Sequence, residues 1–292
     1  MTSHVETPNA ATIRSAYPTV YRFFRHRLAI LGLVLLALLT IACFVGPHLL
    51  PHDELFIDMR HRFSAPFTNG HILGTDPLGR DIAARLFKAG QVSLMVALTA
   101  MLMSICIGVV IGVIAGYFRG TLGSVLMRFV DACLSFPSIF LLLTLAAFVQ
   151  PSPFMITILI GATSWMEIAR IVEAEVKSLR ERDFISAAQM LGLSSNWIMW
   201  REILPNTMGS IIVAATLTIA RAILSEAYIS FLGYGIQPPN PSWGNMLNGA
   251  QQYLTQAPWL AIIPGIAIAL AVTGFNFIGD GLRDALDNRS DA

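Results

Sequence analysis

Two ionisable residues lie inside a strongly apolar stretch of the chain. Arg221 and Glu226 fall within residues 208–232, which are otherwise mostly apolar or small. Charged side chains at membrane depth are energetically costly and normally face protein or water. A separation of five residues puts the two about 140° apart on a helix with 3.6 residues per turn. They are therefore not ideal partners for each other. One or both are candidates to face a pathway or a neighbouring subunit, and a structural pairing with another helix is an equal alternative.

Other common chemical motifs are missing from the sequence. It contains no Gly-x4-Gly-Lys-Ser/Thr phosphate loop, so we do not expect the chain itself to hydrolyse ATP. His48 and His52 are four residues apart, but Pro51 between them disfavours a helical pair of metal ligands. The three cysteines match neither a zinc spacing nor a disulfide framework. The sequence thus predicts no catalytic residue, no metal ligand and no cofactor held by this chain.

The most charged run of the chain is residues 173–206. Apolar residues at helical spacing predict an amphipathic helix over 176–191, and Gly192 follows at a position that favours a glycine cap. Ser194 or Ser195 can begin a second helix, which carries Trp197 and other large apolar side chains. Pro205 is expected to close that helix. We therefore expect two short helices that meet at Gly192 and present apolar groups to a partner or to the membrane edge.

The composition identifies the elements that must position these residues. Hydrophobic residues make up 55% of the chain and charged residues only 13%, values typical of a membrane protein. The formal net charge of +1 gives no indication of nucleic-acid binding. A helix needs about 20 apolar residues to cross the hydrocarbon core. The stretches that qualify as transmembrane helices are residues 28–50, about 92–117, about 133–149, about 154–172, about 208–232 and about 258–278.

Positively charged residues orient these six spans. Lys and Arg are concentrated in segments 1–27, 118–132, 170–206 and 283–292, whereas the two later loops on the opposite side carry no charge. This bias predicts that both termini and residues 173–206 are cytoplasmic. The apolar run 28–50 is too long for a signal peptide, so we interpret it as a retained helix. The segment from Tyr17 to Arg27 is rich in aromatic residues and arginine. It suits a position in the cytoplasmic interface of the membrane, and an equal alternative is that its arginines simply flank the first helix on the inside.

The expected organisation is one membrane domain. It comprises a cytoplasmic segment 1–27, a first helix 28–50, an extracytoplasmic loop 51–91, a five-helix core 92–283 that includes the cytoplasmic loop 173–206, and a tail 284–292. Gly108, Gly112 and Gly116 form a stripe of small residues on the second span. Such a stripe favours close helix packing in lipid.

The charged loop resembles the EAA loop of ABC-importer permeases. Its pattern Ser186-Ala187-Ala188-x3-Gly192-x9-Glu202-x-Leu204-Pro205 is similar to Glu-Ala-Ala-x3-Gly-x9-Ile-x-Leu-Pro, with Ser186 and Glu202 as departures. The resemblance implies that a short coupling helix docks on a cytoplasmic ATPase. The residues expected to couple the chain to that ATPase are Ala187, Ala188, Gly192, Ser194, Trp197, Glu202, Leu204 and Pro205.

Two further signatures resemble the dipeptide/oligopeptide (and nickel) subfamily, and the long first outer loop resembles its second, C-type permease. One is the outer-loop run 72–81, with Gly74, Thr75, Asp76, Gly79, Arg80 and Asp81. The other is Leu224–Gly235, which continues through Gln237-Pro238-Pro239 and Pro241-Ser242-Trp243-Gly244. Together with the EAA-like loop, the similarity covers nearly the whole chain after about Tyr21. The implied fold is an all-α, type I ABC-importer permease with six transmembrane helices and both ends inside.

The resemblance also implies partners and a location. A second homologous permease, two cytoplasmic ATPase subunits that bind ATP and Mg, an extracytoplasmic solute-binding protein and membrane lipid are expected, in a bacterial inner membrane. The implied function is ATP-driven import of peptides by alternating access. Import of nickel or glutathione by the same architecture is an alternative. Two other classes of protein also remain open: a secondary transporter, which has no ATPase partner, and a membrane-embedded enzyme. The secondary transporter would show internal repeats, and none is visible.

Overall fold

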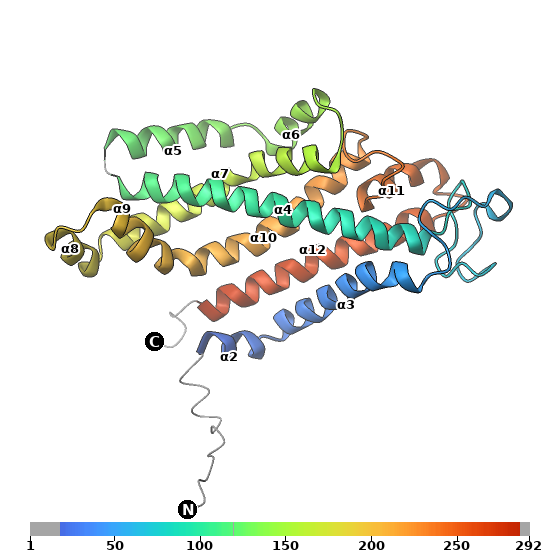
Figure 1. Cartoon of the computed structure of the whole chain (residues 1–292), viewed down its shortest axis with the longest axis horizontal. Helices are drawn as coiled ribbons and strands as arrows, with labels where there is room; N and C mark the ends of the chain where they lie inside the picture. Colours follow the sequence, from blue (N-terminus) through green and yellow to red (C-terminus); the bar gives the residue numbers. More distant parts are fainter. Residues whose placement is uncertain (1–17, 119, 287–292) are drawn as a thin grey trace, which may run out of the picture.

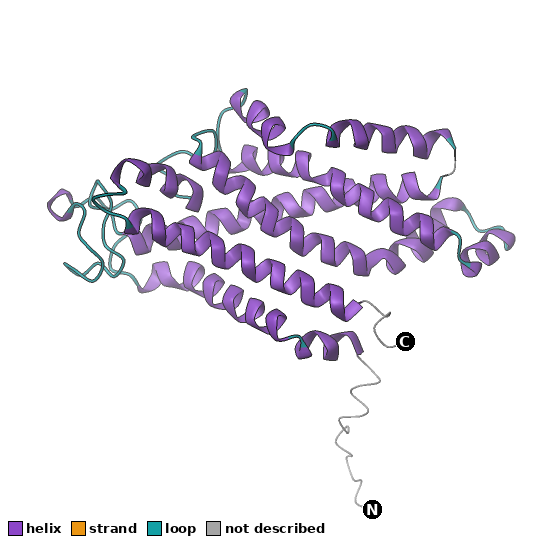
Figure 2. Cartoon of the chain, turned by 180° about the vertical axis from the view of Figure 1, so that it is seen from behind, coloured by secondary structure: helices purple, strands orange, loops and turns teal. Residues whose placement is uncertain are grey.

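The computed structural model describes residues 18–118 and 120–286, and this part of the chain is helical with no strand (Figure 2). Tyr17 of the predicted interfacial segment, and residues 1–16, 119 and 287–292 of the basic segments that orient the spans, lie outside the described residues. The helices are α2 (Pro18–Arg25), α3 (Arg27–Leu49), α4 (Ile82–Tyr117), α5 (Thr121–Leu134), α6 (Ser138–Ala147), α7 (Pro153–Arg180), α8 (Asp183–Met190), α9 (Ser195–Trp197), α10 (Leu204–Phe231), α11 (Trp243–Ala250) and α12 (Trp259–Leu286). A π-helical segment, Ile198–Ile203, joins α9 to α10, and two 3-10 turns occupy Met59–His61 and Gln251–Tyr253.

The long helices run side by side along one axis of the molecule. Figure 1 places α2, α8, α9 and the end of α12 at one end, and the first loop with α11 at the other. The charged loop therefore shares an end with both termini of the described chain, as the charge bias predicts. A membrane leaves only helices and closed barrels as spanning structures, because every backbone polar group must be paired within the protein.

Within residues 18–118 and 120–286, five helices are long and apolar enough to cross a membrane: α3, α4, α7, the run Ser195–Phe231 and α12. A sixth crossing is present only if α5 and α6 are taken together, and these two are bent by 79°. The prediction of a continuous third helix over 133–149 is therefore wrong. Pro137 lies in the break between α5 and α6, where its ring removes a backbone donor and disfavours helical geometry for the preceding residue.

Two other spans are longer than hydropathy predicted. α4 begins at Ile82 instead of Val92, because the Asp81 carboxylate caps it by accepting the Ala84 N–H at 2.9 Å. The outer loop is correspondingly shorter than residues 51–91. α7 continues to Arg180, so the predicted helix 176–191 is split into the end of α7 and the separate α8.

The predicted glycine stripe brings α4 against α7. A methyl group added at Gly112 would lie 2.7 Å from the carbonyl oxygen of Ala169, and one at Gly108 would lie 2.7 Å from that of Trp165. These distances are shorter than a van der Waals contact, so the two backbones approach too closely for any side chain. The stripe is confirmed as a packing surface.

A buried carboxylate joins α4, α10 and the outer segment 236–243. Glu226 is fully buried and accepts hydrogen bonds from the hydroxyls of Ser93, at 2.9 Å, and Ser230, at 2.7 Å. Ser93 Oγ in turn accepts the N–H of Trp243, and Ser230 Oγ accepts the N–H of Ile236. Each buried hydroxyl is therefore both donor and acceptor, which satisfies a polar cluster in the core.

We predict that Gly112→Ala loosens the α4–α7 contact. The added methyl must push against the Ala169 carbonyl, so we expect a loss of about 1–3 kcal/mol in the free energy of unfolding, the usual cost of overpacking. Reversible denaturant unfolding of the detergent-solubilised chain measures it. Gly265→Ala is the matched control, because nothing lies within 4 Å of that position and alanine favours helix. Equal stability of the two variants would contradict the close contact.

We also predict that Glu226→Leu destabilises the outer half of the bundle. Leucine leaves the Ser93 and Ser230 hydroxyls without their acceptor, at a cost of about 1–3 kcal/mol. Glu226→Gln retains one acceptor and should lose less. Thermal melting of the purified variants gives the ranking wild type, Gln, Leu. A leucine variant as stable as wild type would show that the network contributes nothing.

Candidate functional site

The bend in the charged loop is a helix cap of defined geometry. The Leu193 N–H donates to the Ala188 carbonyl at 3.2 Å, and the Gly192 N–H donates to the Gln189 carbonyl at 3.0 Å. These are the two bonds of a Schellman motif, which requires a left-handed residue at the position that Gly192 occupies with φ of +77°. The spacing between Ala188 and Gly192 in the EAA-like pattern is thus the spacing of this cap.

The helix after the bend is continuous with the fifth span. The Ser194 hydroxyl caps it by accepting the Trp197 N–H at 3.3 Å. The chain then passes through the π-helical segment 198–203 into α10, in which Pro205 occupies the first turn. The prediction that Pro205 closes this helix is wrong. The Leu204 N–H bonds the Met199 carbonyl, five residues back, so the helix changes register just before the proline that lacks a donor.

The loop is anchored to three spans by one apolar cluster. Ile185 and Ala188 of α8, together with Ile198 and Ile203 of the π-helical segment, are buried. They belong to a cluster with α4, α7 and α10 side chains, namely Val109, Val113, Tyr117, Ile168, Val172, Val176 and Ile211. A close-packed cluster of this kind resists deformation, so α8 and the helix after it are held to the bundle as one unit.

An arginine adds a polar contact to this anchor. The Arg180 guanidinium donates to the carbonyls of Gly116, at 3.1 Å, and Tyr117, at 2.9 Å. These are orphan acceptors at the C-terminal end of α4, where a cation is favourable. Sequence reasoning missed this role, because nothing in the local pattern around Arg180 points to carbonyls on another helix.

The same loop exposes large apolar side chains beyond the bundle. Met190 is 88% exposed and Leu191 80%, while Trp197 and Trp200 are each 41% exposed. Glu202 is half-buried, and Ala187 and Ser186 are exposed. An exposed apolar patch with a polar rim marks an interaction surface. The predicted docking residues therefore lie along α8, the bend, the π-helical segment and the first turn of α10, and Ala188 and Leu204 among them pack against the apolar cluster.

At the opposite end, the outer-loop signature folds around Asp76. Its carboxylate accepts the backbone N–H groups of Leu78 and Arg80 and the Arg80 Nε at 2.6 Å, and Arg85 Nε lies 3.8 Å away.

Gly79 has φ of +75°, and a side chain there would collide with the Asp58 backbone. Thr75 is buried and donates to the His61 carbonyl. Gly74 is also at positive φ, and a side chain there would collide with the Ser64 carbonyl.

A hydrogen bond from His61 to Asp58, at 2.8 Å, supports the neighbouring turn. This bond holds the pKa of the Asp58 carboxyl below its ordinary value, because it favours the ionised form.

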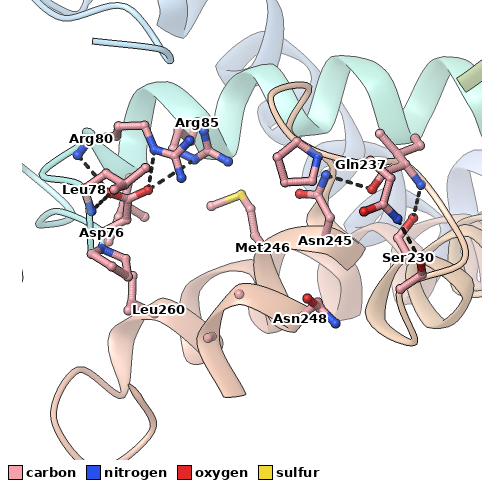
Figure 3. Close-up of a pocket in the computed structure, with 17 residues that line it drawn as sticks. Asp76, Leu78, Arg80, Arg85, Ser230, Gln237, Asn245, Met246, Asn248 and Leu260 are labelled. Atoms are coloured by element: carbon pink, nitrogen blue, oxygen red, sulfur yellow. Dashed lines mark hydrogen bonds and ion pairs between the residues drawn. The ribbon is translucent and has the colours of Figure 1, made fainter. Parts of the chain in front are cut away.

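This signature forms one wall of a cavity of about 170 Å³. Figure 3 shows Asp76, Arg80 and Arg85 on one side, with Gln237, Asn245 and Asn248 on the other and Met246 between them. The second outer signature supplies the amide side, where Asn245 Nδ2 bonds the Ile236 carbonyl at 3.1 Å and completes a capping box with Ser242. The two outer signatures, far apart in sequence, thus meet in one cavity.

The ionisable residues of the fifth span have separate partners, in agreement with the estimate that they lie about 140° apart on the helix. Arg221 pairs with Glu167 of α7, whereas Glu226 belongs to the buried serine network. The Arg221 and Glu167 side chains remain 54% and 51% exposed. They line a small cavity of about 60 Å³ together with Thr163, Ser164, Ser225 and Tyr228. Near the inner end, Arg170 Nη2 lies 3.0 Å from Asp131 Oδ1.

Comparisons with known proteins agree with this architecture. Residues 108–291 match the family model described as the inner membrane component of binding-protein-dependent transport systems. Residues 19–66 match the N-terminal TM domain of oligopeptide transport permease C. The chain is 42% identical over 267 residues to the oligopeptide transport system permease protein OppC of Escherichia coli (strain K12), covering 91% of this chain and 88% of that protein. It is 38% identical to OppC of Haemophilus influenzae, with coverage of 91% and 86%.

These matches span nearly the whole chain and exceed what chance similarity produces. They support an ABC-importer permease over a secondary transporter. They also agree with a multi-pass location in the inner membrane. The chain therefore belongs to the family of binding-protein-dependent inner membrane transport components, the permease subunits of ABC importers.

Proposed function

We propose that this chain passes peptides across the inner membrane by alternating access, driven through the loop between α7 and α10. One observation carries the proposal: the helix that begins at Ser194 is continuous with α10 up to Phe231. A partner that displaces the exposed Trp197 surface would move a transmembrane helix directly, without an intervening hinge. Such a displacement selects between two packed arrangements of the bundle.

The proposal of a peptide substrate is supported by the relatives, whose names specify oligopeptide transport. It is also supported by the half-exposed Arg221–Glu167 pair beside serine and threonine hydroxyls. A zwitterionic peptide presents a carboxylate and an ammonium group, which complement these two side chains. Arg221 and Glu167 are thus suited to contact the substrate during passage, whereas the buried Glu226 serves structure.

Membership of the family implies that the chain works with other subunits of an ABC transporter. Of the two cytoplasmic ATPases, we assign one to the patch around Met190, Leu191 and Trp197, with ATP and Mg bound by the ATPases. A second permease would complete the pathway. A solute-binding protein would dock at the outer end, where the uncharged loop 233–242 forms the rim of the cavity in Figure 3.

The coupling assignment predicts that Gly192→Pro inserts normally but does not transport. Proline holds φ near −65° and cannot adopt the value of +77° at this bend, so the cap and the direction of the next helix are lost. Trp197→Glu should also uncouple, because it places a charge in the apolar docking patch. ATP-driven uptake into proteoliposomes containing the full transporter, together with ATPase stimulation by substrate, measures both effects.

Gly192→Asn is the matched control, since asparagine tolerates the left-handed conformation and nothing crowds the site. It should retain most of the uptake. Normal transport by the proline and glutamate variants would remove the docking assignment.

The substrate assignment predicts ATP-dependent uptake of labelled di- and oligopeptides by the reconstituted transporter. Peptides should compete with one another for the same pathway, whereas free nickel, which carries neither a carboxylate nor an ammonium group, should neither be accumulated nor inhibit. Arg221→Gln should lower the rate for free peptides more than for peptides with an amidated C-terminus, because the amide lacks the carboxylate that pairs with arginine. Accumulation of nickel or glutathione without peptide uptake would overturn this assignment while leaving the permease family intact.

A further inference from the structure

Three side chains with metal-binding chemistry converge at the outer end of the bundle. His52 follows the end of α3, His71 lies in the first outer loop, and Asp81 caps the start of α4. Each offers a nitrogen or oxygen atom, and these atoms lie within 4.8 Å of one another. The histidines have no metal-ligand spacing in the sequence, because the three residues come from separate segments that only the loop brings together.

The separation of the imidazoles fits a shared ion. The ring centroids of His52 and His71 are 5.1 Å apart. Two imidazoles that bind one tetrahedral zinc ion with Zn–N bonds of about 2.0–2.1 Å have ring centres roughly 5 Å apart. His61 lies further away, with its ring 6.4 Å from that of His71, and it is hydrogen bonded to Asp58. The candidate ligands are therefore His52, His71 and Asp81.

Asp81 and His71 are already held in place. Both side chains are buried, and His71 Nδ1 lies 2.6 Å from Asp81 Oδ2. The other oxygen, Oδ1, accepts the Ala84 N–H. The arginines of this loop are directed elsewhere, because Arg80 and Arg85 both face Asp76. The negative charge of Asp81 is therefore not paired with Arg80 or Arg85. An ion would fit between His71 and Asp81 if these two side chains moved slightly apart.

His52 supplies an independent indication. Its Nδ1 is shielded from solvent and has no hydrogen-bond partner among the described residues. A buried polar nitrogen without a partner is costly and rare in native structures. The ring lies against those of Phe56 and His71 at interplanar angles of 34° and 35°, so its position is defined by packing rather than by a polar contact. A metal ion at the centre of the cluster would satisfy this nitrogen.

We propose that His52, His71 and Asp81 bind a divalent transition metal ion of the zinc class, which ties the end of α3 to the start of α4. Two neutral imidazoles and one carboxylate form a ligand set that zinc favours, and water would complete a tetrahedron. The ion would cross-link the outer loop, in which no cysteine is available for a disulfide. This inference is independent of the substrate that the permease carries.

The test measures metal binding by the full-length chain, purified in detergent with a tag free of histidine and stripped with a chelator. Equilibrium dialysis against Zn²⁺, with metal quantified by atomic absorption, should give about one tightly bound ion per chain. Co²⁺ in place of zinc should give the intense visible absorption of a tetrahedral nitrogen and oxygen site. His52→Ala should weaken binding at least about tenfold, because it removes a direct ligand.

His48→Ala is the matched control. His48 is an exposed histidine near the end of α3, outside the cluster, and its loss should leave zinc binding unchanged. Absence of bound zinc and of the cobalt spectrum in the wild-type chain would overturn the proposal, whether or not the variants fold. Zinc binding of equal affinity in the His52→Ala chain would overturn it as well. Both measurements proceed without transport, so failure of the peptide assignment would leave them interpretable.

Discussion

The close contact between α4 and α7 is the constraint on which the rest of the structure depends. Glycines at 108, 112 and 116 let the two backbones meet, and a side chain at any of them would collide with α7. In lipid, helices gain little from burying apolar surface, so close van der Waals contact of this kind holds spans together. α7 also carries Glu167 toward Arg221 and Arg180 toward the end of α4. A looser contact would displace both polar pairings.

The two ends of the bundle are built differently. At the cytoplasmic end, an apolar cluster fixes α8 and the π-helical segment to α4, α7 and α10, while Met190 and Trp197 remain outside. At the outer end, carboxylates organise the chain: Asp76 gathers two arginines, Asp81 caps α4, and Glu226 holds two serines. Rigid packing suits an element that receives force. A polar, hydrogen-bonded loop suits a surface that faces water and a soluble partner.

The helical pattern of the membrane segments was readable from the sequence, but prolines and caps decided where the helices end. Pro137 breaks the third span as a proline in a helix interior is expected to. Pro205 does not break its helix. The π-helical segment before it already shifts the backbone hydrogen bonding by one residue at Leu204, so the helix continues without the N–H that proline lacks. Hydropathy placed the start of α4 too late, since Arg85 and Lys88 lie in its first turns. The Asp81 cap was the overlooked signal.

The sequence by itself determined the class of fold, the orientation of the spans and the bend at Gly192. These depend on composition, charge bias and spacing within a single turn, which are local properties. Only the tertiary structure decided that Arg221 pairs with Glu167, that Arg180 caps α4, and that His52, His71 and Asp81 meet. Those partners come from helices and loops that are far apart in the sequence, and their distances follow from how these elements pack together. No one-dimensional spacing carries that information.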